Sequence, residues 1–350
     1  MKFPEKIEQK ISEIVIDILF KRFESFPEDS DKNRNAPFHE SFLQAFSDKL
    51  EDIQTSSSAL ISLSSWLHGL NTSLGQTFFE KVAHAISCGE KREFTASRHS
   101  LLHITQAQKL AIYEIMTDLS NSNSLPNLAR ELEAIPEKGE GEMTEISGFC
   151  ADVFCETADS IVAIELKSVK PNSGEMKGEK QKILIGRTAL KNKYPNKSVE
   201  YYIAFPFDPT VDTSTASPCN YDKSRFLSNI VNGNKFYDQD EVLLASELWD
   251  FLSGETGTMQ EILEIINSIA TPSFMDKYSV INSFNGNYSD EIIKVLEEWH
   301  LHSELDVSHN CTQIKAIIAS NRMLTKTYHQ SILRPSYNTD RYQTLIDLIK

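Results

Sequence analysis

The sequence lacks the features of a membrane protein or of a disulfide-stabilised secreted protein. No apolar run approaches the roughly 18 residues that a membrane helix needs, and the N-terminal segment is amphipathic and charged, unlike a signal peptide. The five cysteines are scattered and odd in number, without a Cys-x-x-Cys pair. This pattern argues against a structural zinc site and favours a reducing compartment. We therefore expect a cytoplasmic protein with no membrane association.

An excess of basic residues is also absent. The chain has 35 Lys and Arg against 50 Asp and Glu, a net charge of −15, which argues against generic DNA binding over the whole surface. There are no internal repeats and no low-complexity tract of note. With 40% hydrophobic and 24% charged residues, the 350 residues have the composition of an ordinary globular protein, with enough chain for one large domain or two modest ones.

The most informative stretch consists of two strongly β-forming runs, residues 149–155 and 161–169. The polar segment 156–160 between them has the composition of a turn, so the sequence predicts a β-hairpin. Charged side chains interrupt both apolar runs, at Asp152 in the first and at Glu165 and Lys167 in the second.

The register of this hairpin decides whether those charges meet. Side chains alternate between the faces of a strand, so Glu165 and Lys167 share one face. A five-residue turn places Asp152 opposite either Ile164 or Glu165, and a slip of one residue moves Asp152 to the wrong face. In the register that pairs Asp152 with Glu165, two carboxylates and one ammonium converge at one end of the sheet.

Charges on apolar strands require compensation, because burial of an unpaired charge is costly. Mg²⁺ is a hard cation that takes one or two carboxylates and completes its coordination with water and substrate phosphate. We therefore predict that Asp152 and Glu165 hold Mg²⁺ and that Lys167 neutralises a phosphate or assists an attacking water. The alternative is an exposed strand edge whose charges only maintain solubility.

Asp152, followed by Glu165-Leu166-Lys167, resembles the PD-(D/E)xK nuclease signature, with Ala151 where the signature has proline. The surrounding residues are similar to type II restriction endonucleases of the TdeIII type, from about residue 50 to about residue 270. The stretches that add to this resemblance are Trp66–Gly75, Phe78–Glu80, Gly89–Arg92 and Lys170–Asn172. The resemblance implies that Asp152 and Glu165 bind Mg²⁺, that Lys167 is catalytic, and that the recognised site is a short palindrome of the GGNCC kind.

The segment around the proposed site is locally basic. Between residues 160 and 200, nine basic residues stand against four acidic ones. A basic cleft in an acidic protein concentrates a polyanion, although the lysines are also compatible with a solvated helix face. The predicted DNA-binding residues are Lys170, Asn172, Lys177, Lys180, Gln181, Arg187 and Lys191. Candidates in the later loops have ordinary loop composition, and we assign them no role; they are Lys223, Arg225, Asn229, Asn232 and Asn234.

The elements around the hairpin complete the predicted fold. A helix over 175–193 and a strand over 199–205 follow it, and the order strand, strand, helix, strand predicts a mixed α/β core. The fold class is therefore α/β (α+β), a restriction-endonuclease-like core whose mixed sheet is flanked by helices, with helical N-terminal and C-terminal regions. Further helices are predicted over 1–25, 38–50, 56–70, 74–88, 105–119, 127–135, 241–252, 259–269, 291–299, 312–323 and 341–349.

The predicted domains are a helical region over 1–135, a catalytic core with DNA-facing loops over 136–270, and a helical region over 271–350. Glu114, Glu131 or Glu133, on helices before the sheet, are candidates for a third carboxylate at the metal.

Three functions are compatible with these observations. The first is a Mg²⁺-dependent restriction endonuclease that cuts double-stranded DNA as a homodimer, because a two-fold protein matches a palindrome. The second is a nuclease with the same core but no fixed recognition sequence, used in DNA repair or RNA processing. The third is a non-enzymatic helical interaction protein whose strands are only structural.

Overall fold

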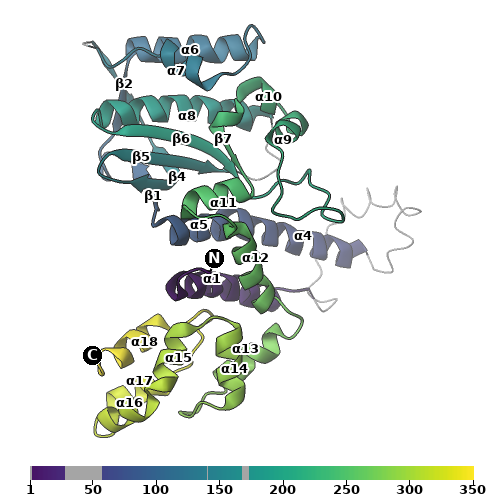
Figure 1. Ribbon diagram of the computed structural model, residues 1–350, viewed down its shortest axis with the longest axis vertical. Helices are drawn as coiled ribbons and strands as arrows, with labels where there is room; N and C mark the ends of the chain where they lie inside the picture. Colours follow the sequence, from purple (N-terminus) through teal and green to yellow (C-terminus); the bar gives the residue numbers. More distant parts are fainter. Residues whose placement is uncertain (1, 28–56, 140, 168–172) are drawn as a thin grey trace. The chain divides into compact units, whose positions relative to one another are not determined.

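The computed structural model describes residues 2–27, 57–139, 141–167 and 173–350. The described chain divides into two compact units, one formed by Phe79–Glu261 and the other by Lys2–Phe78 with Ile262–Lys350. The first unit contains a five-stranded sheet in the order β1-β4-β5-β6-β7 (Figure 1). Its strands are β1 (Glu90–Phe94), β4 (Phe149–Glu156), β5 (Ser160–Leu166), β6 (Ser198–Phe205) and β7 (Val242–Leu244).

The predicted hairpin is confirmed. Strands β4 and β5 pair antiparallel, with Val153 opposite Ile164. The turn is closed by a backbone hydrogen bond of 2.9 Å from Thr157 N–H to the Ser160 carbonyl, and the Ser160 N–H donates back to the Thr157 hydroxyl at 3.0 Å. A polar turn of this kind satisfies its own backbone groups, which is why the segment between the two apolar runs reverses the chain.

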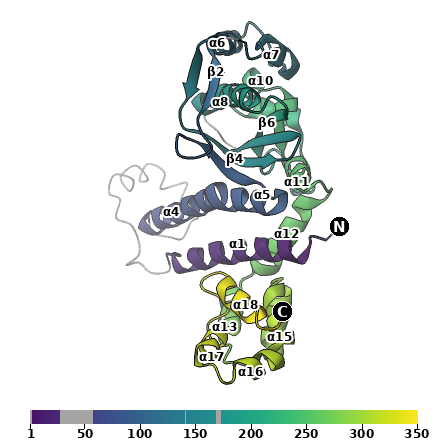
Figure 2. The ribbon, with the colours of Figure 1, turned by 90° about the vertical axis from the view of Figure 1, so that its left-hand side faces the viewer.

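The crossover after the hairpin makes the sheet mixed. Helix α8 (Ser173–Lys193) connects β5 to β6, and β5, β6 and β7 run parallel, whereas β4 is antiparallel to both of its neighbours, β1 and β5. Figures 1 and 2 show α8 along one face of the sheet, with α5 (Phe79–Ser87) and α11 (Ser246–Ser253) along the other. The sequence-based prediction of a mixed sheet flanked by helices is therefore confirmed.

Close packing of α8 on the sheet depends on a glycine. A Cβ built at Gly186 would lie 2.4 Å from the Phe149 ring and 2.8 Å from the Tyr201 ring. Both rings are buried, and they meet edge to face with centroids 5.9 Å apart. Only a residue without a side chain lets the helix approach these two rings, so Gly186 sets the distance between α8 and the strands.

The remaining elements of the first unit surround this core. Strands β2 and β3 form a separate antiparallel pair, and α6 begins with a capping box in which Thr105 and Gln108 satisfy each other's backbone N–H groups. These elements are β2 (Leu102–Thr105), α6 (Gln106–Ser120), α7 (Leu128–Ala134), β3 (Met143–Ile146), α9 (Lys223–Asn229), α10 (Gly233–Phe236) and η4 (Gln239–Glu241).

The second unit is helical. A buried ion pair lies inside it, between Arg341 and Glu304, with Nη1–Oε2 at 2.6 Å and both side chains fully buried. Hydroxyl groups of Tyr288 and Tyr337 also donate to Glu304, so this buried carboxylate is fully hydrogen-bonded. The helices are α1 (Glu5–Glu24), α4 (Ser57–Ser73), η3 (Leu74–Phe78), α13 (Phe274–Asn282), α14 (Asp290–Glu298), α15 (His302–His309), α16 (Cys311–Ile318), α17 (Arg322–Tyr328) and α18 (Thr339–Ile346); α12 (Thr258–Ile269) begins in the first unit and ends in the second.

Some predicted boundaries were wrong. The start of the helix expected over 241–252 is strand β7, because its apolar residues pair with β6 in the buried sheet before α11 begins. Gly69 lies inside α4 and does not end it, and the helix expected over 312–323 is two helices, α16 and α17. The helix expected over 38–50 lies outside the described residues.

The three-part division of the chain stays a prediction. Among the described helices, none is long and apolar enough to cross a membrane.

Candidate active site

Asp152 and Glu165 lie on neighbouring strands in the register that brings them together. The β4–β5 pairing has Val153 opposite Ile164, and continued by one position it sets Asp152 opposite Glu165. The Asp152 side chain reaches across to β5, where its Oδ2 accepts a hydrogen bond of 3.0 Å from the Leu166 N–H. The two carboxylates interact electrostatically. The structure thus places the first two predicted catalytic residues side by side.

An irregularity in β4 coincides with Asp152. Between Glu90 and Arg92 on β1 the chain advances two residues, while the opposing β4 segment from Phe154 to Ala151 advances three. The extra residue lies within Asp152-Val153, and such a bulge re-aims a side chain at the edge of the regular pairing. The burial pattern agrees, because Val153 and Phe154 are both buried although they are consecutive.

Glu165 is an acid held in a buried environment. Only 4% of the residue is exposed, and its two oxygens accept from Lys167 Nζ at 2.9 Å and Lys182 Nζ at 2.5 Å. Burial, followed by the negative charge of Asp152, raises the pKa of Glu165, while the two ammonium groups oppose that rise. An acid with this combination of burial, a like charge and cationic partners is typical of functional sites.

Lys167 lies between two carboxylates. Its Nζ is 2.9 Å from Glu165 Oε1 and 2.9 Å from Glu179 Oε1, and its backbone N–H donates to the Ala204 carbonyl of β6 at 2.9 Å. Although burial opposes it, the charges and hydrogen bonds of both acids raise the pKa of Lys167 above its ordinary value. The side chain therefore carries its proton at neutral pH and acts as a fixed cation.

Helix α8 contributes two residues to the site that the sequence analysis did not assign there. They are Glu179 and Lys182, which lie one helical turn apart and reach the Glu165 and Lys167 side chains. The spacing of three residues on a helix predicts that they share a face, but only the packing of α8 on β5 shows which face. The sequence alone could not supply that information.

Helix α5 and strand β1 approach Asp152 from another direction. Lys91 Nζ lies 3.5 Å from Asp152 Oδ1 and 3.0 Å from Glu80 Oε2, and the His84 ring nitrogen is 2.7 Å from the Asp152 backbone carbonyl. Glu80 and Lys91 lie in stretches that carried the family resemblance, although no role was predicted for them. Together these contacts hold the Asp152 segment against α5.

The donors of this cluster suit a hard cation. Asp152, Glu165 and Glu179 offer only oxygen atoms, and within the described residues Glu179 Oε2 is buried without a hydrogen bond, with Lys182 Nζ 4.0 Å away. The buried Tyr201 hydroxyl, which interacts with the same carboxylates, has no hydrogen-bond partner there either. Unsatisfied buried oxygens next to paired carboxylates are what a bound ion with its water would complete.

The predicted third carboxylates lie elsewhere. Glu131 is buried in an ion pair with Lys180, at 2.6 Å, and a second buried acid, Glu241, also accepts from Lys180. Glu114 and Glu133 are exposed. The structure therefore brings none of these three acids into the Asp152 cluster, and the further acids that pair with its lysines are Glu179 and Glu80.

The predicted DNA-binding residues have different environments. Lys180 is fully buried between its two acids, so its ammonium is not available to a phosphate. Lys177 and Gln181 are exposed on α8, and Lys191 is exposed but donates to the Pro195 and Lys197 carbonyls at the end of that helix. Arg187 is half-buried, and burial lowers its pKa. The other two predictions, Lys170 and Asn172, lie outside the described residues.

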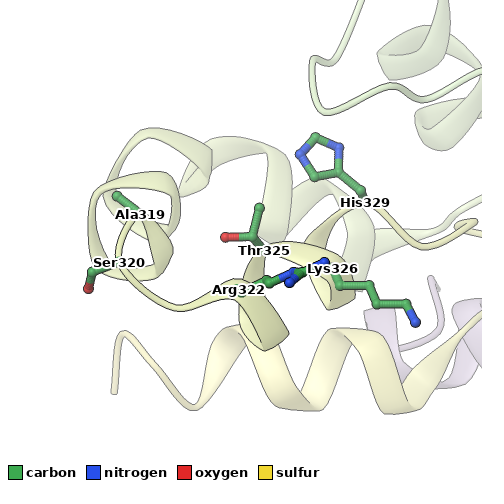
Figure 3. A pocket seen from close by; sticks show the side chains of 6 residues that line it. All are labelled: Ala319, Ser320, Arg322, Thr325, Lys326 and His329. Carbon is green, nitrogen blue, oxygen red and sulfur yellow. The ribbon is translucent and has the colours of Figure 1, made fainter.

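Two pockets in the described part of the chain differ chemically from this site. One, of about 580 Å³, lies in the helical unit, and Figure 3 shows its six lining side chains, which include Arg322, Lys326 and His329. The other, of about 780 Å³, lies near α8, with Lys138 and Lys193 in its lining. Neither lining contains a carboxylate, so neither offers the oxygen ligands of a Mg²⁺ site.

A mixed sheet whose hairpin carries paired acids and a lysine is consistent with a restriction-endonuclease-like core. The chain belongs to the HinfI type II restriction endonuclease family, whose model matches residues 3–270. It is also 38% identical to the type II restriction enzyme MjaII of Methanocaldococcus jannaschii, over 99% of this chain and 98% of that protein. No solved structure matches.

These comparisons confirm the predicted class and decide between the three functions. The chain is a type II restriction endonuclease, a site-specific deoxyribonuclease that cuts DNA. The matching family carries the name HinfI, whereas the sequence resemblance was drawn to enzymes of the TdeIII type, and the match begins at residue 3 and not near residue 50. Enzymes of this class generally use divalent metal ions.

Proposed function

We propose that this endonuclease uses Mg²⁺ bound by Asp152 and Glu165, with Lys167 as the catalytic cation. The observation that carries the proposal is the convergence of the three side chains at one end of the hairpin, where Glu165 is 4% exposed and in direct contact with Lys167. Two carboxylates form an open set, which leaves coordination positions for water and for a phosphate oxygen. In the described part of the chain, Glu179 does not join Asp152 and Glu165 in one group of ligand atoms within 4.8 Å, so we assign it the role of a partner that holds Lys167.

The bound ion would polarise the scissile phosphate and lower the pKa of a water molecule. Asp152 is held for its role by the Leu166 N–H, which fixes the carboxylate between the strands. Lys167 keeps its proton, because two acids raise its pKa, so its role is to orient the water and to offset charge on the phosphate, not to accept a proton. Lys182 partly neutralises Glu165, which keeps two close carboxylates from repelling each other.

DNA is proposed to approach along the exposed face of α8. Lys177 and Gln181 are exposed there, and phosphate contacts by such side chains position a duplex without reading its sequence. Arg187 and Lys191 stay in the proposal as weaker candidates, since one is half-buried and the other is hydrogen-bonded at the helix end. Lys170 and Asn172 remain proposed on sequence grounds, and Lys180 is left out because of its burial.

A two-fold arrangement is proposed for the active enzyme. A homodimer presents two equivalent cutting sites to the two strands of a palindrome. The proposed recognition site is a short palindrome of the GGNCC kind, which follows from the resemblance described above. Digestion of a sequenced phage genome, with the fragment ends mapped, would give the recognition sequence, the cut position and the overhang together.

Isosteric variants test the catalytic assignment. Asp152→Asn and Glu165→Gln retain side-chain volume but remove the charge that holds the cation, and Lys167→Met removes the ammonium. Each is expected to lower cleavage by at least about 100-fold, with discrete bands from the wild-type chain as reference. The matched control is Asp159→Asn, an exposed acid in the turn of the same hairpin, which should cut normally. Normal cutting by Glu165→Gln would rule out the mechanism.

A further inference from the structure

A second group of metal-ligating side chains lies in the helical unit. Glu8, on α1, meets His300, in the turn after α14, and His302, the first residue of α15. Glu8 Oε2 is 2.8 Å from His302 Nε2 and 3.7 Å from His300 Nδ1, and the three ligand atoms lie within 4.8 Å of one another. In the described residues, this is the one group of three or more His, Cys, Asp or Glu side chains with such a geometry.

The backbone around the trio is held in place on both sides. His300 has a φ of 53°, in the left-handed region that non-glycine residues rarely adopt. Just after α14 ends, the Leu301 N–H donates to the Leu296 carbonyl at 2.9 Å. The Ser303 N–H donates to Gln9 Oε1 at 2.7 Å, which fixes the turn against α1. These contacts fix the backbone that carries both imidazoles against α1.

Access to the trio is limited but open. The Glu8 side chain is 7% exposed, whereas those of His300 and His302 are 22% and 25% exposed. The carboxylate thus forms the buried floor of the group and the two rings form its partly solvated sides. An ion could enter from solvent, and one coordination position would face water.

We propose that Glu8, His300 and His302 bind a zinc ion in the helical unit. Two imidazole nitrogens and one carboxylate oxygen form a ligand set that suits Zn²⁺, whereas Mg²⁺ prefers oxygen ligands alone. Ligand atoms around one tetrahedral Zn²⁺ lie about 3.4 Å apart. This value falls between the 2.8 Å from Glu8 Oε2 to His302 Nε2 and the 3.7 Å from Glu8 Oε2 to His300 Nδ1. A search based on cysteine spacing does not find this site, because its ligands are His and Glu and because Glu8 is separated from the two histidines by most of the chain.

Burial lowers the pKa of His300, and the neighbouring His302 and Lys2 add to that effect, while Glu8 opposes it. The bound ion would join α1 to the turn before α15, two segments far apart in the sequence, and would stabilise the helical unit by mass action.

Zinc titration of the full-length chain, without an affinity tag and with its cysteines blocked by N-ethylmaleimide, tests the proposal. After removal of metals with a chelator, the wild-type chain should bind one Zn²⁺ tightly, and Co²⁺ should give the visible absorption of a tetrahedral site. Glu8→Gln keeps an amide oxygen that can accept from His302, so the fold is preserved. It and His302→Gln should each lower zinc affinity by at least about 100-fold.

The matched control is His309→Gln, an exposed histidine at the end of α15, which should bind zinc like the wild-type chain. The double variant Asp152→Asn, Glu165→Gln separates this site from the proposed Mg²⁺ site, and it should retain full zinc binding. Zinc binding that survives Glu8→Gln, or that is lost in the double variant, would overturn the proposal. A melting temperature that zinc fails to raise in the wild-type chain would identify the trio as a hydrogen-bonded contact only.

Discussion

Lys180 offers a direct test of how the first unit is built, because sequence and structure assign it different roles. As a DNA-binding residue it would contact a phosphate, whereas in the structure its ammonium is fully buried between Glu131 and Glu241. It also lies 5.6 Å above the Tyr237 ring. The perturbation is Lys180→Met, which removes the charge and retains most of the apolar length of the side chain.

The expected effect is a large loss of stability. Removing one partner of a buried ion pair costs about 3–5 kcal/mol, because the other charges stay buried without compensation. At about 2–4 °C per kcal/mol, the melting temperature of this unit should fall by roughly 6–20 °C. Replacing Glu241 as well, in Lys180→Met with Glu241→Gln, should restore part of the loss because one uncompensated charge is removed.

The stability loss caused by Lys180→Met should depend on pH in a defined direction. Burial raises the pKa of Glu241, and the charge of Glu131 adds to the rise, while Lys180 opposes it. A carboxyl whose pKa is raised by folding destabilises the protein as the pH rises through that folded value. Lys180→Met removes the opposing effect, so its deficit in stability should be greater at about pH 8 than at about pH 5.

The assay is thermal unfolding followed by circular dichroism, with Lys177→Met as the control on the exposed face of α8. The control should unfold near the wild-type temperature. Lys180→Met could instead unfold near the wild-type temperature and weaken DNA binding, with the slope of log affinity against log salt concentration reduced by about one. That result would show that Lys180 contacts a phosphate, and it would refute the buried ion pairs with Glu131 and Glu241.

Three further outcomes follow from other contacts. Lys182→Gln removes a cation that opposes the raised pKa of Glu165, so the acid limb of the cleavage profile should move to higher pH; an unmoved limb would contradict this role. Arg341→Met leaves Glu304 buried and unpaired and should cost about 3–5 kcal/mol in urea unfolding, whereas wild-type stability would show that the pair is dispensable. Gly186→Ala inserts a methyl group against two aromatic rings and should cost about 1–3 kcal/mol, so an unchanged melting temperature would disprove the close packing.

The sequence predicted the elements whose residues specify their own local structure. The hairpin was expected over 149–155 and 161–169 and is observed as Phe149–Glu156 and Ser160–Leu166, because the alternation of apolar and polar residues and a polar turn are local signals. The length of that turn leaves two registers open, and the structure has the one that joins Asp152 to Glu165. Helix α8 and strand β6 were predicted for similar reasons.

What the sequence could not predict depends on contacts between distant segments. Strand β1 carries charged residues and has no apolar alternation, so its place beside β4 is set by tertiary packing. The positions of Glu179 and Lys182 at the site depend on the orientation of α8, and the burial of Lys180 depends on acids 49 residues before it and 61 after it. A basic residue on a helix resembles a DNA contact in sequence, whether it faces solvent or a buried carboxylate.

The most direct test of the central claim is to locate the metal. Crystals of the chain with uncleaved DNA, soaked in Mn²⁺ as an anomalous substitute for Mg²⁺, would show where the ion binds. We expect one anomalous peak at a coordination distance of about 2.0–2.6 Å from one oxygen of Asp152 and one of Glu165. A peak elsewhere, with those two carboxylates still bound only to lysines, would contradict the proposed site.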